Sequence, residues 1–156
     1  MRKRGLPVRA VLVGCICALY WSASSGAESV IGVVKTVKGN VAVYRDGKAL
    51  PVEPGTVLMS ADRIVTSKDS ALGIALKDDT IVSMGSGTTV TLDRFAFNST
   101  SNAGDMALSI LRGSMVFVTG LIGKFNPQAV AVKLPTATVG IRGTEFAVEV
   151  NPEHRK

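Results

Sequence analysis

Residue types that usually perform catalysis are sparse in this chain of 156 residues. The only histidine is His154, so hydrolytic triads and metal sites built on histidine lack their central residue. The two cysteines, Cys15 and Cys17, lie together in an apolar N-terminal segment. Walker A, G-x-G-x-x-G and H-E-x-x-H patterns do not occur, and residues 85–87 (GSG) do not match a nucleophile elbow.

Carboxylates are the remaining candidates for acid–base chemistry, because glycosidases work with a pair of them. The candidates are Asp62, Asp78, Asp79, Asp93 and Glu145. Asp78 and Asp79 fall between two expected strands, where turn formation explains both. No calcium-loop pattern is visible. We therefore predict no catalytic residue, no metal site and no cofactor, and expect that the protein is not an enzyme.

The first 27 residues have the layout of a secretory signal peptide. A basic start is followed by an uncharged segment at 10–21, and Ser25 and Ala27 occupy the −3 and −1 positions of a cleavage site before Glu28. The apolar run is shorter than the about 20 residues of a membrane span. We expect cleavage between Ala27 and Glu28; the alternatives are an uncleaved membrane anchor and a lipoprotein modified at Cys15.

Removal of this segment changes the charge of the protein. It takes away four of the 18 Lys and Arg residues and none of the 12 acidic residues, so the net charge falls from +6 to +2. A dense basic stripe does not remain, which argues against nucleic-acid binding. Both cysteines also leave, which suits an oxidising compartment. The expected location is periplasmic or secreted.

The exported part, residues 28–156, consists of short alternating segments separated by turns. Asp46 and Gly47 suit the positive φ of a tight hairpin, and Pro51 should lie at a sheet edge. Strands are expected near 39–45, 48–52, 56–59, 63–66, 71–76, 80–84, 88–92, 107–111, 114–119, 129–134 and 144–150. Residues 121–128 should be irregular or form one helical turn at most. The pattern predicts an all-β fold: a single β-sandwich or roll-like domain of about ten short strands.

Alternation also assigns faces to particular strands. Leu72, Ile74 and Leu76 should share one apolar face of strand 71–76. In strand 144–150, Phe146 and the valines at 148 and 150 should face inward, with Glu145 and Glu149 outward. The segment 111–118 (LRGSMVFV) also echoes 37–44 (VKGNVAVY), as duplication of one β unit would produce. We favour the simpler interpretation that a glycine followed by alternating valines recurs in any β protein.

Residues 135–150 (PTATVGIRGTEFAVEV) resemble the signature of the FecR-type domain, which occurs in exported parts of bacterial proteins. The resemblance extends over about residues 31–150, through GVVKTVKGNVAVYRDGKALPVEPGTVL, the middle segment ADRIVTSKDSALGIALKDDTIVSMGSGTTVTL and LSILRGSMVFVTG. Ala61 and Asp79 stand where the family usually has glycine, and Asp tolerates left-handed backbone better than most residues. With residues 1–27 assigned as signal peptide from their layout, the resemblance implies that 28–156 form a FecR-like β domain.

The signature supplies the candidate functional residues, which we expect to be mainly structural: Thr136, Gly140, Arg142, Gly143, Thr144, Glu145 and Phe146. Arg142 lies between Gly140 and Gly143. It either fixes a sharp corner through hydrogen bonds or binds a partner from an exposed loop, and we favour the first interpretation. Arg142→Ala should lower stability by about 1–3 kcal/mol, because the corner loses its charged hydrogen-bond donor.

Two further expectations concern partners. Relatives commonly continue past the position of Val150 into further strands, so strand 144–150 could present an unpaired edge for self-association or strand addition. Alternatively, Pro152 and the charged tail could blunt that edge. We expect a non-catalytic exported protein that acts through contacts with an envelope protein, with envelope sensing or signalling as a candidate role. The alternative is a cell-wall or carbohydrate-binding module, against which stands the scarcity of aromatic residues.

Overall fold

The structure, a computed structural model, describes residues 30–141 and 143–151. The expected cleavage site at Ala27 and Glu28, as well as Arg142, lies outside these residues. The strands are β1 (Val30–Lys38), β2 (Val41–Arg45), β3 (Lys48–Pro51), β4 (Val57–Met59), β5 (Arg63–Thr66), β6 (Ala71–Leu76), β7 (Ile81–Met84), β8 (Thr89–Phe97), β9 (Gly104–Val118), β10 (Val130–Lys133), β11 (Thr138–Gly140) and β12 (Glu145–Val150). Helix α1 (Leu121–Phe125) and a 3-10 turn (Pro127–Ala129) follow β9.

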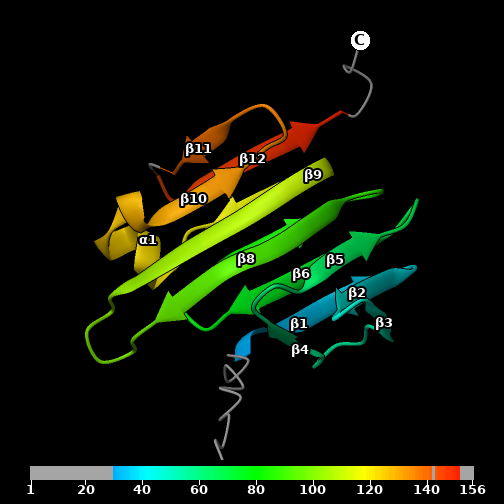
Figure 1. Ribbon diagram of the computed structural model, residues 1–156, viewed down its shortest axis with the longest axis horizontal. Coiled ribbons are helices and arrows are strands. Elements are labelled where there is room, and N and C mark those ends of the chain that lie inside the picture. Colours follow the sequence, from blue (N-terminus) through cyan, green and yellow to red (C-terminus); the bar gives the residue numbers. More distant parts are fainter. Residues whose placement is uncertain (1–29, 142, 152–156) are drawn as a thin grey trace, which may run out of the picture.

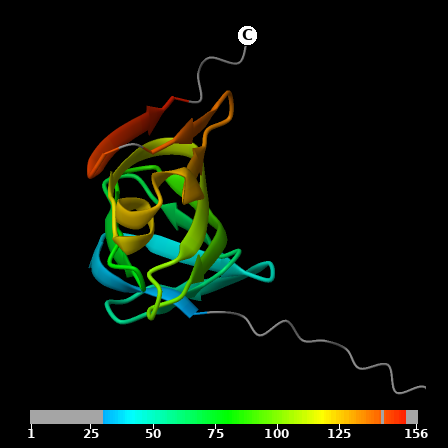
Figure 2. The ribbon, with the colours of Figure 1, turned by 90° about the vertical axis from the view of Figure 1, so that its left-hand side faces the viewer.

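All strands belong to one curled sheet, as the all-β prediction expects. The order along the sheet is β3-β2-β5-β8-β9-β7-β6-β1-β4, with β10 and β12 also paired to β9 and β11 paired to β10. Figure 2 shows the sheet rolled up, with α1 at one open end. Among the described residues, no helix is long and apolar enough to cross a membrane.

Strand β9 is the central strand of the roll, and its length differs from the prediction. The sequence predicts two strands, at 107–111 and 114–119, separated by residues 112–113, but β9 is one strand of 15 residues. Its register against β8 shifts near Arg112, and Gly113 has a φ of +89°. A bulge of this kind bends a strand without ending its pairing. The first part of β9 therefore pairs with β8 and the second with β7.

The core fills the inside of the roll. The predicted inward face of β6, formed by Leu72, Ile74 and Leu76, is buried. Phe146 and Val148 of β12 are half-buried and pack against the same core, and Glu145 and Glu149 are exposed, as alternation predicts. The ring of Phe146 lies 5.3 Å from that of Phe117 in β9, which attaches β12 to the interior.

The echo between residues 37–44 and 111–118 is a structural correspondence. The pairing of β2 with β5 matches that of β9 with β7, residue for residue. Val41↔Thr66, Ala42↔Val65, Val43↔Ile64 and Tyr44↔Arg63 correspond to Met115↔Met84, Val116↔Ser83, Phe117↔Val82 and Val118↔Ile81. The order along the chain differs, because β2 precedes its partner β5 whereas β9 follows its partner β7, so the shared register does not require duplication of one β unit.

The two glycines of the echo play the same role. Gly39 and Gly113 both have positive φ, at +73° and +89°. The residue after each glycine donates its amide to a hydroxyl of a facing turn and accepts a hydrogen bond from that turn. The bonds are Asn40 N to Ser70 Oγ (2.9 Å) with Ser67 N to Asn40 O (2.9 Å), and Ser114 N to Thr88 Oγ1 (3.0 Å) with Gly85 N to Ser114 O (2.9 Å). The sheet therefore contains this local arrangement twice, once around β2 and once around the second part of β9, and we call these two regions the two halves of the sheet.

Several turns follow from the sequence. Asp46 and Gly47 have φ of +50° and +76°, as the predicted hairpin requires. Asp79 and Ala61, which stand where the resemblance leads us to expect glycine, also have positive φ, at +65° and +69°. Asp tolerates this conformation, whereas the Cβ of alanine is crowded by it.

We predict that Ala61→Gly stabilises the protein. Glycine relieves the left-handed strain at +69°, and the gain exceeds the extra entropy of the unfolded chain by about 0.5 kcal/mol. Urea denaturation measures the change. As a control, Ala75→Gly in the extended strand β6 should lower stability by about 1 kcal/mol. A loss of stability in Ala61→Gly would contradict the assigned strain.

Candidate functional site

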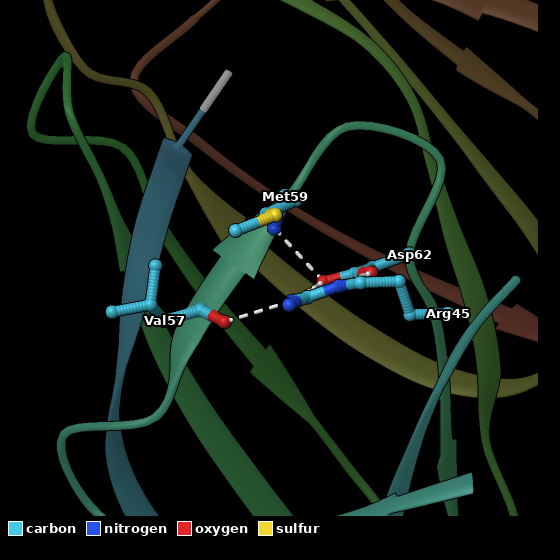
Figure 3. Close-up of polar contacts among 4 residues, drawn as sticks. All are labelled: Arg45, Val57, Met59 and Asp62. Atoms are coloured by element: carbon cyan, nitrogen blue, oxygen red, sulfur yellow. Dashed lines mark hydrogen bonds and ion pairs between the residues drawn. The ribbon is translucent and has the colours of Figure 1, made fainter. Parts of the chain in front are cut away.

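The predicted carboxylate Asp62 is fully buried and forms an ion pair that the sequence does not reveal. Arg45 donates from Nε to Asp62 Oδ1 at 2.8 Å and from Nη2 to Oδ2 at 2.7 Å. Figure 3 shows both side chains beside β4. Arg45 ends β2, and Asp62 precedes β5, so the antiparallel pairing of these strands brings them together. Because 17 residues separate Arg45 from Asp62 in the sequence, no local motif predicts this ion pair.

This ion pair closes the outer edge of β4. Arg45 Nη2 also donates to the carbonyl of Val57 at 3.0 Å, and the Met59 amide donates to Asp62 Oδ2 at 2.8 Å (Figure 3). Strand β4 pairs with β1 on its other side. Unpaired backbone groups at a sheet edge invite pairing with other chains, and covering them prevents it. Arg45 and Asp62 thus have a structural role at this edge.

Asp78 is also buried, and it holds the start of α1. Its Oδ2 accepts hydrogen bonds from Thr80 Oγ1 at 2.7 Å and from the Ile122 amide at 3.3 Å. Its backbone carbonyl accepts from the Leu121 amide at 2.6 Å. A Cβ at Gly120 would lie 2.2 Å from that carbonyl oxygen, so glycine is required for this close approach. The turn explanation of Asp78 is supported, with an added anchoring role.

The other predicted carboxylates lie apart from these two. Asp93 on β8 accepts from Ser109 Oγ at 2.6 Å and from Lys133 Nζ at 3.3 Å, across neighbouring strands. Asp79 is exposed in its turn, and Glu145 is exposed on β12. Among the described residues, no three acidic, histidine or cysteine side chains gather as a metal site would require.

Two of the remaining edges are also unsuitable for pairing. Strand β11 has three residues. Strand β3 has four and pairs with β2 alone, so the prediction that Pro51 lies at an edge is confirmed. Ser67 N donates to Asn40 O, which places the polar groups of residues 40, 42 and 44 toward β5. By the same alternation the backbone nitrogen of Pro51 faces away from β2. Because this nitrogen carries no hydrogen, it cannot donate to a strand added at this edge.

Among the described residues, β12 is the edge without such protection; Pro152 and the charged tail, the alternative means of blunting it, lie outside these residues. It has six residues and pairs with β9 alone. Thr144 O accepts from the Thr119 amide at 2.7 Å, so in the antiparallel ladder residues 145, 147 and 149 direct their amides and carbonyls away from β9. No described strand pairs with this side. Figure 1 shows β12, in red, along the border of the sheet beyond β10.

The correspondence between the two halves of the sheet sharpens this contrast. Ala42 pairs with Pro51, and its counterpart Val116 pairs with Ala147. Ala147 therefore occupies the place of Pro51 and retains its outward amide. The same sheet position is blocked in one half and open in the other.

A shallow groove of about 420 Å³ runs over the outer face next to this edge. Residues 83–85 of β7 and the following turn, 114–116 of β9 and 147–149 of β12 line it. Small side chains form its floor, with Val116 37% exposed, and Glu149 is the charged residue of its lining. The groove and the open edge form one continuous surface, which we call the β12 edge.

The family-signature residues lead into this surface. Thr136 lies exposed in the bend between β10 and β11, and Gly140 ends β11. The hydroxyl of Thr119 donates to Gly143 O at 3.1 Å, which together with the Thr144 bond ties the segment to the end of β9. Glu145 and Phe146 then begin β12, with opposite faces.

Arg142 lies outside the described residues, so its assigned role stays a prediction. The sequence predicts the strand of the candidate site and the faces of its residues. It does not predict the groove residues on β7 and β9, since the pairing of these strands carries no signal in the sequence.

Comparison with known proteins agrees with the resemblance noted in the sequence. A family model described as FecR protein matches residues 62–156, more than half of the chain. No curated protein and no solved structure matches it. The matched family is a regulatory and signalling family and is typically associated with the envelope. The matched part begins at the buried Asp62 and includes all of β12. The chain belongs to the FecR family.

Proposed function

We propose that the protein is exported to the bacterial envelope and acts there, without catalysis, by binding another protein through the β12 edge. The observation that carries the proposal is the contrast among the edges: β4 is capped by Arg45 and Asp62, β3 carries Pro51, β11 is short, and β12 is open. Addition of a partner strand to an exposed edge is a common mode of peptide recognition. Membership in a regulatory family supports a role in envelope signalling.

The alternative, carbohydrate binding, gains less support from the described residues. Sugar-binding surfaces commonly use exposed aromatic rings. Tyr44 is 39% exposed, but the guanidinium of Arg63 lies 5.6 Å from the centre of its ring. Phe125 is exposed on α1, at a different part of the molecule. These two rings do not form one platform, so protein contact is the better proposal.

We predict that Ala147→Pro abolishes partner capture while the fold is retained. Proline removes the outward amide at the centre of β12, and Pro51 occupies the corresponding place in β3 without disturbing that strand. The free energy of unfolding should change by less than about 1 kcal/mol. Capture is measured in producing bacteria with a photo-crosslinking amino acid at position 83 of the full-length protein, where Ser83 is exposed in the groove and both glutamates of β12 are kept.

Two controls make this experiment specific. Ala147→Ser keeps the amide and should keep capture. A crosslinker at Lys68, which is exposed in the turn between β5 and β6, should capture nothing in common with position 83. Equal capture by the folded Ala147→Pro variant would show that the β12 edge is not the contact site.

A further inference from the structure

The outward face of β12 carries a negative charge at each end. Glu145 and Glu149 are exposed on the same face, with Ala147 between them. Neither glutamate takes part in any of the ion pairs among the described residues. A strand that pairs with this edge therefore places two of its own side chains directly opposite two carboxylates.

The inward face of β12 sets a different requirement. Phe146, Val148 and Val150 are half-buried and pack against the core from the border of the sheet. A strand added beside β12 would place the side chains of its inward face next to these three. Apolar side chains there would extend the core and cover the parts of the three residues that remain exposed.

The centre of the outward face leaves space. Ala147 is small, and beyond it the groove exposes Ser83, Ser114 and Val116. The residue of an added strand that lies opposite Ala147 can therefore be large, because its side chain can extend over Ala147 toward Val116.

A second copy of the same chain is a poor occupant of this edge. Antiparallel pairing of two β12 strands centred on Ala147 places Glu145 of each copy opposite Glu149 of the other. Like charges directly opposite one another destabilise a strand pair. Centring the pair on Val148 places the two Glu149 side chains at diagonal positions, where they still repel. Charge thus favours a different chain.

We propose that the β12 edge binds an extended segment of another protein with the pattern basic, apolar, bulky, apolar, basic. The two basic residues lie opposite Glu145 and Glu149, the bulky residue lies opposite Ala147, and the two apolar residues continue the core. The proposal rests on the function proposed above and adds the chemistry of the partner. The partner's backbone supplies the pairing, and its two basic residues supply the selectivity.

The test uses the full-length protein and two synthetic peptides. One is acetyl-TKVYVKT-amide, which has the proposed pattern in either strand direction. The other is acetyl-TEVYVET-amide, in which glutamates replace the lysines. Fluorescence anisotropy of labelled peptides at low salt should give an affinity for the lysine peptide about tenfold or more above that for the glutamate peptide. The preference should shrink as salt screens the charges.

Two protein variants separate charge recognition from strand pairing. The double variant Glu145→Lys and Glu149→Lys should reverse the preference, so that the glutamate peptide binds about tenfold more tightly than the lysine peptide. Both side chains are exposed, so this variant should fold normally. Ala147→Pro should bind neither peptide.

Each result bears on the proposal. Equal binding of the two peptides, or an unchanged preference in the double lysine variant, would overturn it. Concentration-dependent self-association that Ala147→Pro removes would also overturn it, in favour of a second copy. If the peptides fail but capture from position 83 in bacteria still depends on Ala147, the contact site stands and the partner chemistry is wrong.

Discussion

Gly113→Ala should destabilise the protein by about 3 kcal/mol or more, the larger of the two main effects that we predict. Gly113 has a φ of +89°, which L-residues rarely adopt. A Cβ at this position would also lie 2.5 Å from Thr88 Cα and 2.3 Å from Thr88 Oγ1. Since Thr88 Oγ1 accepts from the Ser114 amide, the added methyl group displaces a bond that fixes the bend of β9. Urea denaturation of the purified protein measures the loss.

Gly87→Ala is the matched control. Gly87 also has positive φ, at +62°, but a Cβ at this position would meet no heavy atom within 4 Å beyond its chain neighbours. The strained backbone conformation alone should therefore lower the free energy of unfolding of Gly87→Ala by about 1 kcal/mol. The difference between the two variants measures the contact with Thr88. Equal losses would mean that β9 accommodates the methyl group and that the bend does not depend on this approach.

Arg45→Met should lower the free energy of unfolding by about 3 kcal/mol. The substitution keeps much of the side-chain volume but removes both ion-pair bonds to Asp62 and the bond to Val57 O. The Asp62 carboxylate then remains buried without its counter-charge, and the Val57 carbonyl at the β4 edge loses its cap. Urea denaturation measures this loss, and sedimentation velocity shows whether the uncapped edge causes association.

The exposed pair of Arg94 and Asp105 provides the comparison. The side chains are 63% and 44% exposed, and the hydrogen bond and charge of Asp105 raise the pKa of Arg94. Arg94→Met should leave the stability almost unchanged, because solvent screens exposed ion pairs. If Arg45→Met proves no more harmful than Arg94→Met, the buried pair does not stabilise the fold as proposed.

The expected results differ because the two arginines differ in burial rather than in bonding. Both donate to a carboxylate from another segment, Asp62 just before β5 and Asp105 in β9. The position of the carboxylate, inside or outside the roll, determines the cost of removing its partner. That position comes from the pairing of β2 with β5 and of β8 with β9, and the residue types alone do not reveal it.

Local chemistry in the sequence determined most of the strands, several turns and the faces of β6 and β12, whereas β1 and β11 were not predicted. Alternation of apolar and polar residues has the period of a strand, so the pattern alone assigns Leu72 and Phe146 to the inside. Asp46 and Gly47 marked a hairpin because few residues accept positive φ. The signature at 135–150 identified the family, and the family match confirms it. These features depend on residues close together in the chain.

Tertiary structure decided which edges are closed and which is open. From the sequence alone Asp62 is a candidate for acid–base chemistry. In the folded protein β2 places Arg45 next to it, and β4 places Val57 and Met59 beside both side chains. The continuity of β9 through Gly113, and the equivalence of Ala147 with Pro51, also follow from strand register. Register is set by contacts between residues far apart in sequence, and a shift of one residue would turn every side chain to the other face. For that reason the sequence predicted the strand 144–150, whereas its place at an unprotected border required the assembled sheet.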